Sequence, residues 1–283
     1  MRRPVVNVRS VLVTGCSSGI GAATVTHLRD LGWRVLATAR SADDLAALEA
    51  DGFETLALDL ADETSVAQCA ELALTRCADG LGGLVNNAGY AQPGAVEDID
   101  RDRLRRQLEV NVVGLQDLTN RVIPTMRRQG WGRIVNVSSL YGRIVAPLVG
   151  AYCASKYALE ALSDAMRMEL WSSGVGVSLI EPGAIVTDFR KNAAVAAEAS
   201  LDADGSVFGD AYDRKIVRKK HKVETTDFMR RSPEEVAAKI HHALSSPRPR
   251  RRYGVTPAAG LVAVLRRIAP DALLDAIGRR SLK

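Results

Sequence analysis

The sequence has few aromatic residues and no long hydrophobic run. Phe, Trp and Tyr make up 5% of the 283 residues, whereas 47% are hydrophobic, so small aliphatic side chains must fill the core. This composition is typical of parallel sheets, whose strands are buried on both faces. No apolar run reaches the ~18 residues that a membrane-spanning helix needs. The length predicts one large α/β domain or two small ones.

Cysteines are also few, and their spacing excludes two further classes of protein. Cys16, Cys69, Cys77 and Cys153 form no CxxC pair and have no histidine cluster beside them. We therefore expect reduced thiols, with no disulfide scaffold and no metal site. The apolar run Val11–Val13 is too short for the core of a signal peptide, and we expect a cytoplasmic protein.

Positive charge is concentrated at the C-terminal end. Residues 214–283 hold 18 Lys and Arg against 6 Asp and Glu, whereas residues 1–213 hold 20 against 27. No basic motif with interleaved aromatics and no zinc pattern accompanies this excess. We therefore expect a solvated basic face and no nucleic-acid partner.

The last 27 residues form a separate pattern. Leu261 to Ile277 is apolar at helical spacing, and Arg266, Arg267, Arg279 and Arg280 lie alongside. Such a helix either packs on the domain or a second subunit, or lies on a membrane surface. Packing is the commoner cause, so residues 257–283 are interpreted as a C-terminal amphipathic helical extension, and membrane contact is not favoured.

Short apolar β runs alternate with helical patterns along the rest of the chain. Strands are expected at Ser10–Thr14, Trp33–Ala39, Thr55–Asp59, Leu84–Val85, Ile134–Val137, Val175–Ile180 and Arg250–Val255. Helices are expected up to Leu31, over Ser41–Ala50, up to about Cys77, and over Arg101–Arg128, Ala151–Ser172 and Ser232–Leu244. The alternation predicts a single-domain Rossmann fold, with a doubly wound, seven-stranded parallel sheet and helices on both faces.

A glycine-rich stretch joins the first strand to the first helix. Gly15, Gly19 and Gly21 follow the spacing G-x-x-x-G-x-G. Gly15 permits a tight turn, and the other two let backbone N–H groups approach a pyrophosphate at the helix N-terminus. The intervening Ser17 and Ser18 add hydroxyl donors, and Ile20 completes the predicted phosphate loop. The sequence therefore predicts a dinucleotide site here.

The end of the second strand indicates which dinucleotide. The strand ends at Ala39 and is followed by Arg40, and no carboxylate occurs before Asp43. An acidic residue at this place binds the ribose hydroxyls of NAD, whereas a nearby arginine accommodates the 2′-phosphate of NADP. We therefore expect NADP(H) rather than NAD(H), unless Arg40 is only a surface charge beside a helix. Residues 1–256 are interpreted as the NADP-binding domain.

The helix expected from Ala151 carries a tyrosine and a lysine four residues apart. Tyr152 and Lys156 are i and i+4, so they lie one turn apart on one face. A free tyrosine has a pKa of about 10, and a neighbouring ammonium stabilises the phenolate. A tyrosine with a pKa lowered in this way can exchange a proton with an alcohol oxygen. Alone, the pair is equally compatible with two surface neighbours.

Other polar residues follow predicted strand ends, where ligands bind in such sheets. Asn111 lies in a helix among valines, and it either ties that helix to the sheet or holds a water near Lys156. The segment of about residues 184–231 is interpreted as a lid over the substrate site, although residues 190–231 also fit a charged surface helix pair. The remaining candidates for the cofactor site are Asp59, Leu60, Asn87, Ala88, Gly89, Pro182, Gly183 and Thr187.

Taken together, these residues resemble the short-chain dehydrogenase/reductase family from about Ser10 to Tyr253. The motifs are Thr14-Gly-Cys-Ser-Ser-Gly-Ile-Gly21, Asn86-Asn-Ala-Gly89, Asn111, Ser138-Ser139, Tyr152-Cys-Ala-Ser-Lys156 and Pro182-Gly183. The resemblance implies a catalytic tetrad of Asn111, Ser139, Tyr152 and Lys156. It also implies Thr187 on the nicotinamide carboxamide, and Asp59 and Asn87 on the adenosine half.

The stretch Leu179-Ile-Glu-Pro-Gly183 is similar to the branch that contains 17β-hydroxysteroid and retinol dehydrogenases. That branch implies hydride transfer between NADPH and an apolar ketone or aldehyde, with Tyr152 as acid and base. We further expect a homodimer or homotetramer. Two alternatives on the same fold are a non-catalytic NADP-sensing regulator and an epimerase or dehydratase.

Overall fold

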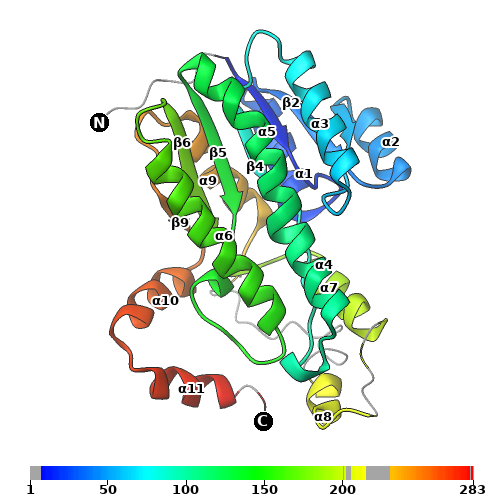
Figure 1. Cartoon of the computed structure of the whole chain (residues 1–283), viewed down its shortest axis with the longest axis vertical. Helices are drawn as coiled ribbons and strands as arrows, with labels where there is room; N and C mark the ends of the chain where they lie inside the picture. Colours follow the sequence, from blue (N-terminus) through cyan, green and yellow to red (C-terminus); the bar gives the residue numbers. More distant parts are fainter. Residues whose placement is uncertain (1–7, 200, 202–204, 215–229, 281, 283) are drawn as a thin grey trace.

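The structure is a computed structural model that describes residues 8–199, 201, 205–214, 230–280 and 282. Its main sheet has seven strands in the order β3-β2-β1-β4-β5-β6-β9, and every neighbouring pair is parallel. The predicted doubly wound sheet is therefore confirmed (Figure 1). The strands are β1 Ser10–Val13, β2 Arg34–Ala39, β3 Glu54–Ala57, β4 Gly83–Asn86, β5 Gly132–Val137, β6 Val175–Glu181 and β9 Arg252–Gly254.

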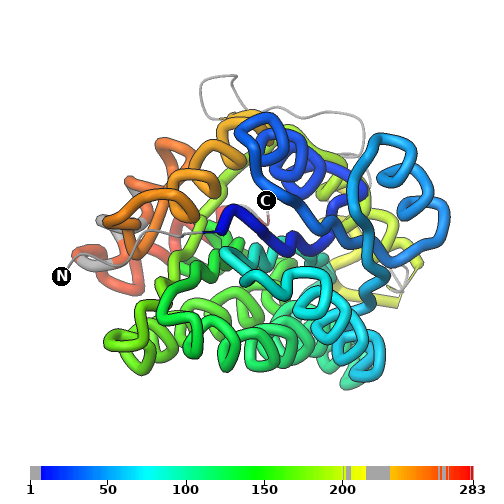
Figure 2. The backbone as a smooth tube through the Cα atoms, turned by 90° about the horizontal axis from the view of Figure 1, so that it is seen from above, coloured from blue at the N-terminus to red at the C-terminus, as the bar shows by residue number. Residues whose placement is uncertain are grey.

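Two layers of helices cover the sheet, as Figure 2 shows. One face packs on α1 (Gly19–Asp30), α2 (Ala42–Ala50) and α9 (Pro233–Ser245), and the opposite face packs on α3 (Glu63–Arg76), α5 (Gly114–Gln129) and α6 (Gly150–Glu169). Aliphatic side chains that alternate along each strand supply both cores. The strand order reverses between β1 and β4, so the ligand crevice of this fold opens at the carboxyl ends of those strands.

The helix predicted over residues 101–128 has three parts. α4 (Arg101–Leu108) leads into a π-helical turn (Glu109–Val113), and α5 follows directly. Pro124 lies inside α5 and does not end it. A Cβ atom on Gly114 would come within 1.8 Å of the carbonyl oxygen of Leu60, so only glycine allows α5 to pass this loop. π-helical turns are frequent at functional sites, and this one contains Asn111.

The C-terminal extension also differs from the expected single helix. It forms α10 (Pro257–Ile268) and α11 (Asp271–Arg280), and Pro270 lies between them. Proline has no backbone N–H to continue a helix, which accounts for the break. Within the described residues, no helix is long and apolar enough to cross a membrane.

The lid region is described in part. It contains β7 (Ala184–Ile185), α7 (Phe189–Glu198) and α8 (Gly209–Tyr212), and β7 pairs with β8 (Arg230–Arg231). The basic run at residues 218–222 lies outside the described residues.

Candidate active site

The glycine-rich turn has the backbone geometry that the sequence predicts. Gly15 and Gly19 have φ angles of 70° and 56°, in the left-handed region that favours glycine. A Cβ on Gly21 would approach the carbonyl oxygen of Gly15 to 1.9 Å, so α1 packs tightly on the turn. Ser18, the N-cap of α1, makes no side-chain cap, and the first turn has no acidic residue. The N-terminal N–H groups can therefore receive an anion.

The strand end at Asn87 holds this turn in place. The hydroxyl of Thr14 accepts hydrogen bonds from the backbone N–H groups of Asn87 and Ala88, each at 2.9 Å. The amide of Asn87 donates to the carbonyl oxygens of Thr14 and Gly15, also at 2.9 Å. These bonds give Asn87 a role in shaping the phosphate loop, besides the adenosine contact that the resemblance implies.

The residues expected around the adenosine half follow β2 and β3. Arg40 is exposed directly after the buried end of β2, at the position where a guanidinium can reach a 2′-phosphate. The carboxylate of Asp59 accepts from the N–H of Ala61 at 2.9 Å, which fixes the loop after β3. Leu60 is buried, and its carbonyl oxygen faces Gly114.

Thr187 lies across the crevice from the glycine-rich turn. A Cβ on Gly19 would lie 3.1 Å from the Cγ2 atom of Thr187. The carbonyl oxygen of Pro182 accepts from the N–H of Leu140 at 2.8 Å. Gly183 packs closely on Thr256, because a Cβ there would come within 2.2 Å of the Thr256 hydroxyl oxygen. The loop after β6 thus faces the phosphate loop.

Tyr152 and Lys156 lie in the first turns of α6, and both are buried. The Lys156 ammonium donates to the carbonyl oxygen of Val137 at 2.8 Å and lies 5.8 Å from the centre of the Tyr152 ring. Burial lowers the pKa of Lys156 to about 8, against the smaller raising effect of the Glu160 carboxylate. The spacing of four residues therefore places the two groups as expected.

The expected lowering of the tyrosine pKa is not found. Burial raises the pKa of Tyr152 above its ordinary value, and a hydrogen bond with Ser139 offsets only part of this shift. The physical reason is desolvation, which penalises the phenolate more than the contact with Ser139 favours it. Tyr152 is consequently a protonated phenol at neutral pH, ready to donate a proton.

Ser138 and Ser139 have different surroundings. Ser139 shares the hydrogen bond with Tyr152 and accepts from the N–H of Tyr141 at 3.1 Å. Ser138 instead lies beside Glu160. Both side chains pack on Gly142: a Cβ there would come within 2.8 Å of the Ser138 hydroxyl oxygen and 2.9 Å of Glu160 Cγ. Ser139 is thus the serine that adjoins the tyrosine.

Asn111 connects three parts of the site. Its oxygen accepts from the N–H of Tyr90 at 3.1 Å, and its amide donates to the carbonyl oxygen of Tyr90 at 2.9 Å and to the hydroxyl of Ser155 at 3.1 Å. It therefore ties the segment after β4 to α6, beside Lys156. The Ser155 contact was not anticipated, although Ser155 lies within the Tyr152–Lys156 motif.

Two aromatic rings that the sequence did not single out flank Tyr152. The centres of the Tyr141 and Phe189 rings lie 6.3 and 5.7 Å from that of Tyr152. Tyr141 follows Ser139 closely, whereas Phe189 comes from α7 in the lid region. The surroundings of the phenol are therefore partly apolar.

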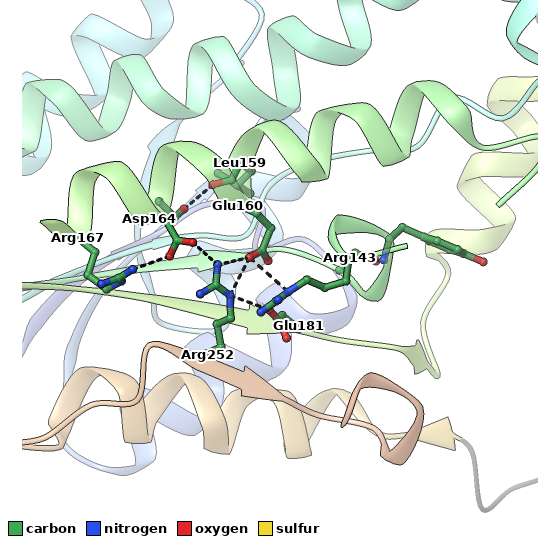
Figure 3. A network of polar contacts seen from close by, with 10 residues as sticks. Arg143, Leu159, Glu160, Asp164, Arg167, Glu181 and Arg252 are labelled. Atoms are coloured by element: carbon green, nitrogen blue, oxygen red, sulfur yellow. Dashed lines mark hydrogen bonds and ion pairs between the residues drawn. The ribbon is translucent and has the colours of Figure 1, made fainter. Parts of the chain in front are cut away.

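A network of buried charges, also unanticipated, supports the site from behind (Figure 3). Arg143 binds Glu181 at 2.8 Å, and Arg252 binds Glu160 at 2.9 Å and Glu181 at 3.2 Å. Arg252 also pairs with Asp164 at 2.7 Å. The network joins the loop after Ser139, the helix that carries Lys156 and the strand that precedes Pro182.

These residues fit a nicotinamide dinucleotide. The uncapped N-terminus of α1 suits its pyrophosphate, and Thr187 lies across from this turn. Among the described residues, no group of His, Cys, Asp and Glu could hold a metal ion.

The chain is similar to several known proteins. The sequence profile of the family described as short chain dehydrogenase matches residues 9–197. The uncharacterized oxidoreductase YbbO of Escherichia coli K12 is 39% identical over 269 residues, which cover 95% of this chain and 93% of that protein.

Two further relatives bear on the expected branch. Human retinol dehydrogenase 16 is 36% identical over 281 residues, covering 94% of this chain and 86% of its own. NADPH-dependent 3-dehydrocapnine reductase of Ornithobacterium rhinotracheale is 33% identical over 284 residues, covering 97% and 98%. The expected likeness to retinol dehydrogenases is therefore confirmed.

Proposed function

Because this chain belongs to the short chain dehydrogenase family, an oxidoreductase family, we propose that it interconverts a ketone or aldehyde and an alcohol with NADP(H). Bound NADPH would supply the hydride for the carbonyl carbon. The chain's own residues bind that cofactor, orient the carbonyl group and supply the proton. The observation that carries the proposal is the buried Tyr152 hydroxyl, which adjoins Ser139 and lies one helical turn from Lys156.

Ser139 and Tyr152 act on the carbonyl oxygen. Negative charge develops on this oxygen during reduction, and donors that are already in place stabilise it. The Ser139 hydroxyl donates a hydrogen bond, and the Tyr152 phenol donates both a hydrogen bond and the proton. Lys156 adds positive charge and binds the nicotinamide ribose. Asn111 holds its end of α6 in position and anchors the water that returns a proton.

The protonation state of Tyr152 suits the reduction step. The raised pKa of Tyr152 keeps the phenol protonated, which is the form that reduction requires. Oxidation would instead need the phenolate, which burial disfavours. A relative described as an NADPH-dependent reductase agrees with this direction.

The substrate we propose is an apolar carbonyl compound of steroid, retinoid or acyl type. Tyr141 and Phe189 supply aromatic surface beside the Tyr152 phenol. The name of the human relative, a retinol dehydrogenase, supports the same class. α7, the described part of the expected lid that carries Phe189, would border the substrate on this side.

NADP(H) is proposed over NAD(H) because of Arg40. The exposed guanidinium follows the buried end of β2, and no carboxylate lies between Ala39 and Asp43.

All four cysteines are free and buried, which agrees with the expected reducing, cytoplasmic environment.

We also propose a homodimer or homotetramer. A groove between α5 and α6, with a volume of about 280 Å³, is lined by Ile123, Leu162 and Met166 among others. Leu162 and Met168 are exposed in the C-terminal half of α6, and Trp171 is exposed just beyond it. Such surfaces suit a second copy of the chain.

Incubation of the protein with NADPH and a panel of ketones tests the function. We expect the absorbance of NADPH to fall, with one NADPH oxidised for each ketone reduced. A regulator would bind NADPH without consuming it, and an epimerase would convert its substrate with no net loss, so either result would contradict the proposal. The Tyr152→Phe variant must lose this turnover.

A further inference from the structure

A small third core lies apart from the two that cover the sheet. Ala95, Leu148, Ala211 and Tyr212 are buried in it, and Leu201, Phe208 and Leu282 pack against them. These residues come from the segment after β4, the loop before α6, the lid region and the C-terminal end of the chain. Four distant parts of the sequence therefore meet at one end of the molecule.

Hydrogen bonds fix the parts of this core to one another. The hydroxyl of Tyr212 accepts from the N–H of Ala95 at 2.8 Å and also contacts Asp98. Ser206 donates to Asp98 at 2.6 Å. On the C-terminal side, a Cβ on Gly278 would lie 3.8 Å from Pro147, so α11 approaches the loop before α6. Figure 1 shows α8 and α11 along the same lower end.

Large aliphatic side chains project into solvent from each of these parts. We define the apolar rim as five residues with exposed fractions of 49% to 85%: Val96, Val145, Val207, Leu273 and Ile277. Val96 directly follows Ala95 of the third core, and Val207 directly precedes Phe208. Ile277 directly precedes Gly278, which approaches Pro147, and Val145 lies two residues before Pro147. Exposed apolar groups gathered at one end of a molecule mark an interaction surface.

Positive charge accompanies the rim. Arg279 and Arg280 lie in the last turn of α11 and are exposed, and residues 257–283 contain five Lys or Arg against two Asp. Leu273 and Ile277 are one turn apart on α11, so they share a face of that helix. An apolar face beside arginines is the pattern of a helix that lies in a lipid interface.

The composition of the rim favours lipid over a protein partner. Its five members are all Val, Leu or Ile, whereas protein interfaces are enriched in aromatic residues and methionine. Exposed residues of that second kind, Met168 and Trp171, lie at the far end of α6. The structure leaves every residue of α11 at least partly accessible, so packing on the domain does not cover its apolar face.

We propose that the apolar rim and α11 dock on a lipid surface with anionic headgroups. The aliphatic side chains enter the boundary between headgroups and acyl chains, and the arginines bind the headgroups. This reverses the preference drawn from the sequence. The docking rests on exposure and charge, independently of the proposed reaction. If the proposed apolar substrate is correct, docking brings the protein to the lipid phase in which such a compound dissolves.

Co-sedimentation of the full chain with vesicles tests the proposal. One set of vesicles is phosphatidylcholine alone, and the other is phosphatidylcholine mixed with phosphatidylglycerol. We expect the chain to pellet with the anionic vesicles and to be released by high salt. The double variant Leu273→Ser, Ile277→Ser should reduce the partition coefficient about tenfold or more, because two aliphatic side chains no longer leave water.

Two further variants make the test specific. The double variant Val96→Ser, Val207→Ser changes the rim outside α11 and should also weaken vesicle binding. Leu72→Ser is the matched control, because Leu72 is 47% exposed on α3, away from the rim, and this variant should bind as the unchanged protein does. Thermal unfolding shows which variants remain folded, and either folded rim variant suffices for the comparison.

Three outcomes would overturn the proposal. In the first, the chain fails to pellet with anionic vesicles. In the second, the rim variants and Leu72→Ser bind the vesicles equally. In the third, light scattering without vesicles shows that the unchanged protein and Leu72→Ser form an oligomer, whereas the rim variants do not. The last result would assign the rim to a second copy of the chain. Turnover of a water-soluble ketone, measured without vesicles, should be unchanged in the rim variants. If the unchanged protein shows no such turnover, that result counts against the proposed reaction and not against lipid docking.

Discussion

The ammonium of Lys156 donates a hydrogen bond to the carbonyl oxygen of Val137 at 2.8 Å. This contact joins α6 to the last residue of β5, directly before Ser138 and Ser139. The lysine on the helix and the serine after the strand are thereby held at a fixed separation. Tyr152, one turn earlier on the same helix, is placed against Ser139 by the same connection.

Replacement of Tyr152 by phenylalanine should remove turnover and leave cofactor binding intact. The phenol supplies the proton in the proposed reaction, whereas the ring alone still fills the buried space. We expect kcat to fall about 100-fold or more. NADPH binding, followed by its fluorescence, should change little. The matched control is Tyr141→Phe, which removes a hydroxyl from the ring 6.3 Å away. Retained turnover in Tyr152→Phe would refute the role.

Replacement of Glu160 by glutamine should move the alkaline limb of the pH–rate profile. Burial lowers the pKa of Lys156 to about 8, so the ammonium is charged below this pH and neutral above it. If its charge supports reduction, the rate falls as the pH rises through about 8. The Glu160 carboxylate raises this pKa, so Glu160→Gln should move the limb to lower pH.

Asp164→Asn is the control for this effect. Asp164 lies one turn further along α6 and binds the same Arg252, but it is two turns from Lys156 and is not among the groups that shift the pKa of Lys156. The alkaline limb should therefore stay in place in Asp164→Asn. A profile that shifts equally in both variants would mean that the charge network acts only on the fold.

Replacement of Arg40 by alanine should reduce the preference for NADPH. A charge-assisted hydrogen bond to a 2′-phosphate would be lost, whereas NADH has no such phosphate. We expect the dissociation constant for NADPH to rise about tenfold or more, and that for NADH to change little. Arg34 at the other end of β2 binds Glu54 at 2.6 Å and provides the control. Equal weakening of both cofactors in Arg40→Ala would contradict the assignment.

Replacement of Gly114 by alanine should destabilise the fold. The new Cβ would lie 1.8 Å from the carbonyl oxygen of Leu60, so α5 would have to move from the loop after β3. We expect a loss of about 3 kcal/mol in the free energy of unfolding. Gly260→Ala is the control, because no atom lies within 4 Å of the added Cβ and α10 favours alanine over glycine. Equal midpoints of urea unfolding would contradict the argument.

The positions of the strands and helices along the chain could be predicted because local patterns carry them. Each strand is a short run of aliphatic residues between turn signals, and each helix has its own periodicity. The glycine turn at Gly15 and the spacing of Tyr152 and Lys156 are also local. These features depend on residues that are neighbours in sequence, so they could be recognised before the structure was known.

Other features depend on contacts between distant residues or on burial. Glu160 and Arg252 are 92 residues apart, and neither belongs to a recognisable motif. The raised pKa of Tyr152 follows from desolvation, which a spacing of four residues does not encode. The break between α10 and α11 had a local signal in Pro270, but the apolar periodicity on both sides concealed it. Exposure of the rim depends on how four segments meet.

The position of Arg252 in the last strand has a consequence for synthesis on the ribosome. Glu160 and Glu181 emerge long before Arg252 does, and until then Arg143 is the partner that the network offers to both carboxylates. Two buried acids with one counter-ion are unfavourable, so the centre of the nascent protein stays loosely formed. Commitment to the native state therefore waits for the final tenth of translation, and nascent chains that stop before residue 252 should be sensitive to proteases.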